Sequence, residues 1–128
     1  MEKNLLDTHT FIWFLNGDKE LSKVARELIT KELVSNFVSI ASIWEIAIKT
    51  SINKLELKTP LYQLAGKLEE NGFEILPVTF ADTLTVSTLP FHHRDPFDRI
   101  IISQAKVNGM TIISKDGEFG NYDVKLVW

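Results

Sequence analysis

Residues 95–116 read DPFDRIIISQAKVNGMTIISKD and contain, in order, a helix start, a helix stop, an apolar strand and an acidic residue. Asp95-Pro96 predicts the helix start, because aspartate caps helices and proline suits the first helical position. Asn108-Gly109 predicts the helix stop. Met110–Ile113 ends in two consecutive apolar residues, Ile112 and Ile113, as expected for a strand that is covered on both faces. This unit predicts a parallel sheet between helices, with Asp116 just past a strand.

The same alternation extends over the rest of the chain. Apolar runs predict strands at residues 4–6, 37–40, 73–78, 110–113 and 124–127. Apolar periodicity and capping residues predict helices from Thr8 through Leu15, over 21–33, after Ser42, from Pro60, from Thr79 to Thr88, and over 96–108. Strands separated by helices predict an α/β fold, an α/β/α sandwich whose five-stranded, mostly parallel sheet is flanked by helices. We expect one domain over residues 1–128.

Composition excludes several classes of function. The chain has no cysteine, which excludes disulfides, zinc–thiolate sites and cysteine nucleophiles. A net charge of −3 argues against a basic protein that coats nucleic acid. No apolar run is long enough to span a bilayer, and Asp7 interrupts the first one, so we expect neither a membrane anchor nor a signal peptide and place the protein in the cytoplasm.

Four acidic residues recur where the predicted strands end or where the following helix begins: Asp7, Glu45, Asp98 and Asp116. Each has an ordinary explanation by itself, as a turn former, a helix cap or the partner of a lysine. The carboxyl ends of parallel strands meet at one rim, however, and ligands bind there. Carboxylates gathered at that rim repel one another unless a cation lies among them. Their recurrence predicts a site for Mg²⁺ or Mn²⁺, which prefer oxygen ligands.

Several neighbours have two open interpretations. Thr8 is a good helix cap, which would free Asp7 for another role, and Lys49 follows Glu45 at the spacing of a helical ion pair. Arg99 could bind phosphate or pair with a carboxylate. We expect His9 to pack under the site at a helix start, and His92 and His93 to be loop residues. The Phe11–Leu15 segment has no polar face, so it is either core or a contact with a protein partner.

Four segments, read together, resemble the PIN-domain family: Leu5-Leu6-Asp7-Thr8, Ser42-Ile43-Trp44-Glu45-Ile46, His93-Arg94-Asp95-Pro96-Phe97-Asp98-Arg99 and Ile113-Ser114-Lys115-Asp116. The resemblance runs over essentially the whole chain and is strongest to the ribonuclease toxins of bacterial VapBC toxin–antitoxin systems. The Asp-Pro-Phe-Asp-Arg block is its most specific part, and the Ser-x-Asp piece is the weakest.

The resemblance implies a PIN-like fold and a metal-dependent endoribonuclease. Asp7, Glu45, Asp98 and Asp116 would be the catalytic, metal-binding acids, Thr8 and Ser114 would order them, and Asp95 would be an auxiliary acid. It also implies an RNA substrate, a cognate antitoxin and a homodimer. A PIN nuclease outside any toxin–antitoxin pair, and a catalytically silent PIN scaffold that binds protein or RNA, remain alternatives.

Two other classes fit less well. A haloacid-dehalogenase-like phosphatase needs a second carboxylate two residues after the first, where this chain has His9. A receiver-like signalling domain needs an acceptor aspartate after the third strand, where the chain reads Pro77-Val78-Thr79-Phe80.

Overall fold

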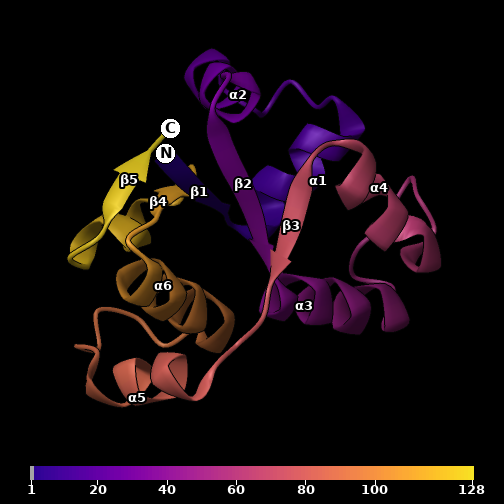
Figure 1. Cartoon of the computed structure of the whole chain (residues 1–128). Helices are drawn as coiled ribbons and strands as arrows, with labels where there is room; N and C mark the ends of the chain where they lie inside the picture. The colour runs from indigo at the N-terminus through magenta and orange to yellow at the C-terminus, as the bar shows by residue number, and fades with distance from the viewer. Residues whose placement is uncertain (1) are drawn as a thin grey trace.

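The computed structural model describes residues 2–128, and its centre is a single sheet of five strands (Figure 1). The strands are β1 (Glu2–Leu6), β2 (Val34–Ser39), β3 (Phe73–Leu76), β4 (Thr111–Ile113) and β5 (Lys125–Val127). They lie in the order β3-β2-β1-β4-β5, and every neighbouring pair is parallel. The predicted α/β fold with a mostly parallel sheet is therefore confirmed.

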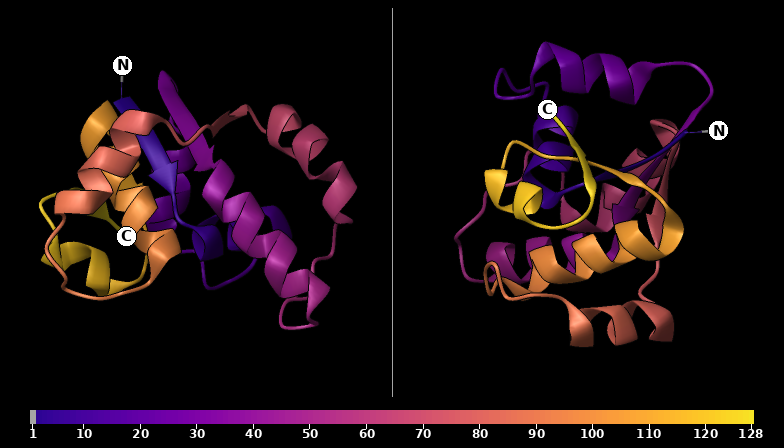
Figure 2. Two further views of the ribbon diagram at one scale, coloured as in Figure 1. Left: turned by 90° about the horizontal axis from the view of Figure 1, so that it is seen from below. Right: turned by 90° about the vertical axis from the view of Figure 1, so that its left-hand side faces the viewer.

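Helices connect the strands and cover both faces of the sheet (Figure 2). They are α1 (Thr8–Asn16), α2 (Lys23–Thr30), α3 (Ile40–Ser51), α4 (Leu64–Glu70), α5 (Phe80–Thr88) and α6 (Pro96–Asn108), with short 3-10 turns at Leu61–Gln63 and Gly117–Asn121. None of the helices within residues 2–128 is both long and apolar enough to cross a membrane.

The two faces of the sheet belong to two separate hydrophobic cores. Consecutive strand residues point to opposite faces. Leu6 and Ile113 therefore join the core formed with α1, α2, α3 and α4, whereas Leu5 and Ile112 join the core formed with α6. All four side chains are fully buried. This two-sided burial explains why the central strands read as continuous apolar runs rather than as alternating ones.

The order of the strands reverses beside β1. The chain proceeds outward from β1 to β2 and β3, and then crosses back to β4 and β5 on the other side. Leu6 of β1 is in register with Val38 of β2 on one side and with Ile113 of β4 on the other. In sheets of this kind, ligands bind at the carboxyl ends of the strands where the order reverses. The residues that follow β1 and β4 are thus placed at such a point.

Helix ends were predicted well where the sequence carries a strong local signal. Asp95 caps α6 by accepting hydrogen bonds from the backbone N–H groups of Phe97 and Asp98, and Gly109 ends it in the left-handed conformation with φ of 63°. Thr79 caps α5 in a reciprocal capping box with Asp82.

The predicted start of α3 was wrong. Ser39, not Ser42, caps the helix by accepting the N–H of Ala41 at 3.0 Å, and Ile40 belongs to the helix rather than to the strand. Two serines three residues apart offer the same local signal. The choice between them is made by tertiary contacts, because the side chain of Ser42 is fully buried against Thr8.

The helix predicted over residues 21–33 is shorter than expected. It spans Lys23–Thr30, and two of its expected apolar positions face solvent: Val24 is 53% exposed, and Leu33 is 82% exposed with φ of 63°. Pro60 precedes a 3-10 turn before α4 instead of opening α4 itself. The strands predicted at 73–78, 110–113 and 124–127 are each shorter by one or two residues, at 73–76, 111–113 and 125–127.

The two sides of α2 give a test of this packing. Ile29→Ala removes a side chain that is 4% exposed in the core and should lower the free energy of unfolding by about 2–5 kcal/mol. Val24→Ala, on the exposed side of the same helix, should change it by less than about 0.5 kcal/mol. Urea denaturation measures both. Comparable losses in the two variants would contradict the observed orientation of α2.

Candidate active site

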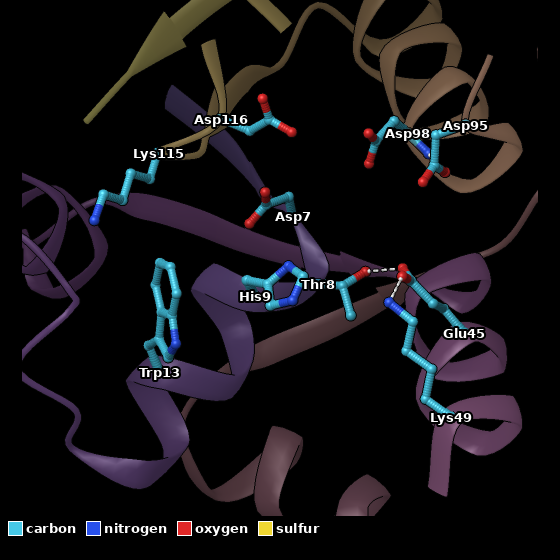
Figure 3. Close-up of a pocket in the computed structure, with 10 residues that line it drawn as sticks. All are labelled: Asp7, Thr8, His9, Trp13, Glu45, Lys49, Asp95, Asp98, Lys115 and Asp116. Atoms are coloured by element: carbon cyan, nitrogen blue, oxygen red, sulfur yellow. Dashed lines mark hydrogen bonds and ion pairs between the residues drawn. The ribbon is translucent and has the colours of Figure 1, made fainter. Parts of the chain in front are cut away.

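A pocket of about 280 Å³ lies at the carboxyl ends of β1 and β4, where the strand order reverses (Figure 3). Its lining residues are Asp7, Thr8, His9, Trp13, Glu45, Lys49, Asp95, Asp98, Lys115 and Asp116. All four acids singled out from the sequence are among them, together with Thr8 and Asp95. The four acids come from four different segments, so the pocket exists only in the folded chain.

Asp7 is fixed on both of its carboxylate oxygens. Its Oδ1 accepts the backbone N–H of Thr10 at 2.9 Å and thereby caps α1, while its Oδ2 accepts the hydroxyl of Ser114 at 2.6 Å. The prediction that Thr8 would cap this helix and free Asp7 was wrong, because Asp7 does both tasks. A carboxylate has about four lone-pair sites, so the second pair of each oxygen remains for a ligand in the pocket.

Ser114 connects the two sides of the site. Its side chain is 1% exposed and lies beneath the pocket rather than in its wall. The hydroxyl that donates to Asp7 also accepts the N–H of Asp116 at 3.0 Å. Asp116 in turn accepts the N–H of Glu118 at 2.9 Å and begins the Gly117–Asn121 turn. Asp116 is therefore both a turn residue and a wall of the pocket.

Glu45 is held by its neighbours. The Thr8 hydroxyl donates to its Oε1 at 2.7 Å and also lies 2.9 Å from the hydroxyl of Ser42. Lys49 donates to its Oε2 at 2.6 Å, from the next turn of α3. Glu45 and Lys49 thus both face the pocket from α3 (Figure 3), and the lysine already occupies one oxygen of this acid.

Asp98 extends from the first turn of α6 into the pocket (Figure 3). The capping of that helix is done by Asp95, which leaves the Asp98 side chain available. Its Oδ2 lies 3.0 Å from Nε2 of His93. His93 lies in a loop, as predicted from the sequence, but its contact with Asp98 was not predicted. Its position five residues before Asp98, in the His93–Arg99 segment that resembles the PIN family, was the signal that could have revealed it.

Arg99 is not a pocket residue. Its side chain is in the core, with the residue 5% exposed, and its guanidinium donates to the carbonyls of Leu89 and Pro90 at 3.3 and 2.8 Å. It also stacks over the ring of Phe91 at 4.2 Å. Both predicted roles, a phosphate contact and a partner for a carboxylate, are contradicted by these contacts.

Aromatic side chains form one edge of the pocket. His9 was predicted to pack under the site, but it is exposed at this edge. Its ring centroid is 5.9 Å from that of Trp13. The ring of Trp13 also packs against that of Trp128, with 5.8 Å between the ring centroids. Phe11 and Ile12 are buried, so the apolar Phe11–Leu15 segment is mainly core.

The comparisons with known proteins agree with the observed fold. A family model for the PIN domain matches residues 5–125. The chain belongs to the PIN-domain family. A search of curated protein sequences gives no match.

Solved structures support the same fold at low sequence identity. The VapBC2 complex of Rickettsia felis bound to a promoter DNA fragment has a TM-score of 0.72 and 18% identity, over 98% of both chains. DNA-bound VapBC of Salmonella typhimurium has a TM-score of 0.69 and 15% identity, over 99% of this chain and 98% of that one. FitAcB of Neisseria gonorrhoeae has a TM-score of 0.66 and 17% identity, over 98% of this chain and 96% of that one.

Two acids of this PIN domain, Asp7 and Asp98, are in an unfavourable environment when they are ionised. Burial raises the pKa of Asp7 above its ordinary value, although the hydrogen bonds from Ser114 and Thr10 oppose the shift. Burial also raises the pKa of Asp98 to about 6, and the negative charges of Asp95 and Asp116 add to this effect against the opposing His93. The pocket thus holds negative charge that its own cations do not fully neutralise.

The donor set fits a hard divalent cation that keeps part of its water shell. Within residues 2–128, no three His, Asp or Glu side chains form a preformed ligand set for one ion. Mg²⁺ does not require such a set, because it commonly retains several waters and binds through one or two carboxylates. Asp7 and Asp98 suit that role best, since both carboxylates lie in the wall of the pocket and each retains lone pairs that its hydrogen bonds do not use.

The raised pKa of Asp98 predicts a pH-dependent stability of the metal-free protein. Because the folded-state pKa is about 6 and the ordinary value is 3.8, the folded state binds the extra proton between these values and the free energy of unfolding falls as pH rises through them. Asp98→Asn removes this titration. In EDTA we expect it to be more stable than wild type at pH 7.5, by roughly 1–3 kcal/mol, with a smaller difference near pH 4.

Urea denaturation at several pH values checks this expectation. Asp123→Asn is the matched control, because Asp123 is exposed and outside the pocket. Its stability should follow that of wild type at every pH. A constant difference between wild type and Asp98→Asn across the range would contradict the assigned pKa.

Proposed function

We propose that this PIN domain is a Mg²⁺- or Mn²⁺-dependent endoribonuclease, formed as one domain by residues 1–128, and that it is the toxin of a VapBC-type toxin–antitoxin pair. The observation that carries the proposal is the convergence of Asp7, Glu45, Asp98 and Asp116 on one pocket at the switch point of the sheet. A nuclease that uses carboxylates and metal needs no nucleophilic side chain, which agrees with a chain without cysteine.

The residues of the pocket divide into distinct roles. Asp7 and Asp98 would hold the cation, with Asp116 and Glu45 beside them. When bound, the cation would supply a water of lowered pKa and would neutralise charge on the reacting phosphate. Ser114 orients Asp7 and Asp116, and Thr8 orients Glu45, through the hydrogen bonds described above.

Positive charge at the pocket supports a phosphate-containing substrate. Lys49 and Lys115 both line the pocket, and each is paired with a glutamate, Glu45 and Glu20 respectively. Both lysine side chains retain substantial exposure, at 38% and 56%. They are therefore positioned to attract a polyanion toward carboxylates that would otherwise repel it. The preference for RNA rests on the resemblance to VapBC ribonuclease toxins.

A protein partner is part of the proposal. Several structural neighbours are toxin–antitoxin complexes, which supports a cognate antitoxin for this chain. An acidic pocket beside Trp13 and His9 would accept an arginine or lysine of an antitoxin segment.

The proposed homodimer would use a different surface. An apolar groove of about 520 Å³ between α3 and α6 is lined by Ile40, Ala41, Trp44, Val78, Pro96, Phe97 and Ile100. Trp44 is 63% exposed and its ring centroid lies 5.3 Å from that of Phe97. Exposed apolar area of this kind marks interaction surfaces.

The catalytically silent scaffold remains the second candidate, favoured by one observation. Both oxygens of Glu45 already have partners within the chain, Thr8 and Lys49. A metal-dependent assay separates the two candidates directly.

The nuclease proposal predicts metal-dependent cleavage of single-stranded RNA. Asp7→Asn and Asp98→Asn should each lower the rate by at least about a hundredfold, because each removes a negatively charged oxygen ligand for the cation. Cleavage of a labelled RNA with Mn²⁺, and with EDTA instead, measures the effect. The exposed Asp123→Asn is again the matched control and should retain the wild-type rate.

Full activity in EDTA, or in both pocket variants, would exclude the metal mechanism. No activity in wild type, together with tight binding of RNA, would favour the silent scaffold. Cleavage of DNA but not of RNA would agree with the metal mechanism and contradict the proposal that RNA is the substrate.

The antitoxin proposal predicts competition between partner and metal. If a basic side chain of the antitoxin enters the acidic pocket, raising the Mn²⁺ concentration should weaken the complex, because both need the same carboxylate oxygens. Trp13→Ala should weaken it as well, since Trp13 lines the pocket. Pull-down of a co-expressed antitoxin at increasing Mn²⁺ tests this. Binding that is independent of Mn²⁺ would place the contact elsewhere.

A further inference from the structure

We propose that His93 is a positioning residue for Asp98: it donates its Nε2–H to the carboxylate, in a tautomer that Tyr122 selects and Arg99 anchors. The inference deepens the proposed function and rests on it, because its purpose is to hold one metal-binding acid in place. His93 and Arg99 lie at the two ends of one short segment, Tyr122 comes from a distant part of the chain, and the side chain of His93 is only 15% exposed.

The tautomer follows from counting donors and acceptors around the Tyr122 hydroxyl. That oxygen accepts the N–H of the His93 backbone at 3.2 Å and an N–H of the Arg99 guanidinium at 3.2 Å. Both donors lack any acceptor capacity, so the hydroxyl has its two acceptor positions filled and one hydrogen to donate. Its nearest acceptor is Nδ1 of His93 at 2.8 Å, whereas the His93 carbonyl is at 3.4 Å.

A His93 ring that accepts at Nδ1 carries its hydrogen on Nε2. This is the nitrogen that lies 3.0 Å from Oδ2 of Asp98, so the bond runs from the imidazole to the carboxylate. In the opposite tautomer, the lone pair of Nε2 would face a lone pair of Asp98 Oδ2. The N–H on Nδ1 would then be a third donor to the Tyr122 hydroxyl. Of the two neutral tautomers, this is the one that leaves every polar group of the network satisfied.

Arg99 supplies the rigidity of the network. A guanidinium is always charged and can only donate. Among residues 2–128 no carboxylate pairs with it, and its two terminal nitrogens donate to the carbonyls of Leu89 and Pro90 and to Tyr122. These carbonyls belong to the segment that leads into His93. Arg99 thereby ties the end of α5, the His93 loop and Tyr122 together from within the core.

The consequence for Asp98 is a fixed orientation with one oxygen left free. Within residues 2–128, no hydrogen bond is formed to its Oδ1. Partners that orient a metal-binding side chain are typically worth about 10–100-fold in metal affinity or activity. His93 is thus the residue that would keep Asp98 directed into the pocket before any cation arrives.

Binding of Mn²⁺ to metal-stripped protein, measured by titration calorimetry at pH 7.5 without substrate, tests the role of His93. We expect His93→Ala to bind Mn²⁺ about 10–100-fold more weakly than wild type. His93→Gln should remain close to wild type, because the glutamine amide can present an N–H near the position of Nε2. The matched control is His92→Ala, which removes the exposed ring that packs edge-on against Tyr122, 4.8 Å between ring centroids, but leaves the hydrogen bond from His93 to Asp98 in place.

The tautomer has its own test, which needs neither metal nor activity. In ¹⁵N NMR spectra of the neutral imidazole, His93 of wild type should carry its hydrogen on Nε2. Tyr122→Phe keeps the buried ring but removes the hydroxyl, so the preference for this tautomer should be lost or reduced. Melting curves of all variants confirm that they are folded under the conditions used.

The outcomes separate this inference from the proposed function. Mn²⁺ binding by wild type with equal affinity in His93→Ala, or a hydrogen on Nδ1 in wild type, would overturn the role of His93 and leave the nuclease proposal intact. Absence of Mn²⁺ binding by wild type would overturn the metal-dependent function and the positioning role with it.

Discussion

The hydrogen bond from Ser114 to Asp7 is the contact on which the site depends. It measures 2.6 Å and joins residues that are 107 positions apart in the chain. It can form only if β4 pairs with β1 in the observed register, because Asp7 and Ser114 follow residues that are direct partners in the two strands. The order of the sheet and the geometry of the first acid are therefore set by the same pairing, and Asp116 is positioned through the same hydroxyl.

Placing acids at this point has an electrostatic cost. Burial raises the pKa of both Asp7 and Asp98, which shows that neither carboxylate is fully compensated by its surroundings. Only Glu45 has a lysine as a direct partner among the four. A cation that binds at this rim would stabilise the fold, because a ligand of the folded state alone adds stability. The same charges that weaken the empty site would give it affinity.

Local signals were sufficient for most of the fold and for the identity of the acids. The signals for helix ends and central strands involve residues only a few positions apart, so they can be read directly from the sequence. Examples are the helix start at Asp95-Pro96 and the helix stop at Asn108-Gly109. The failures share a different cause. The hydroxyl of Ser42 does not cap α3 because it contacts Thr8, which is 34 residues away. The contact that holds the ring of His93 against Tyr122 spans 29 residues. Contacts over such distances have no signature in a short window.

Arg99 shows how a motif can divide between two tasks. In a helix of 3.6 residues per turn, neighbouring side chains point about 100° apart, whereas residues three apart share a face. Asp95 and Asp98 therefore both reach the pocket, while Arg99 is turned into the core. The two tasks are connected through space. Arg99 holds the carbonyls of the loop that carries His93, and His93 returns to Asp98 one position earlier in the same helix. The buried Arg99 thus helps to orient Asp98 through His93. Replacing Arg99 would therefore disturb the acid site, although its guanidinium does not line the pocket.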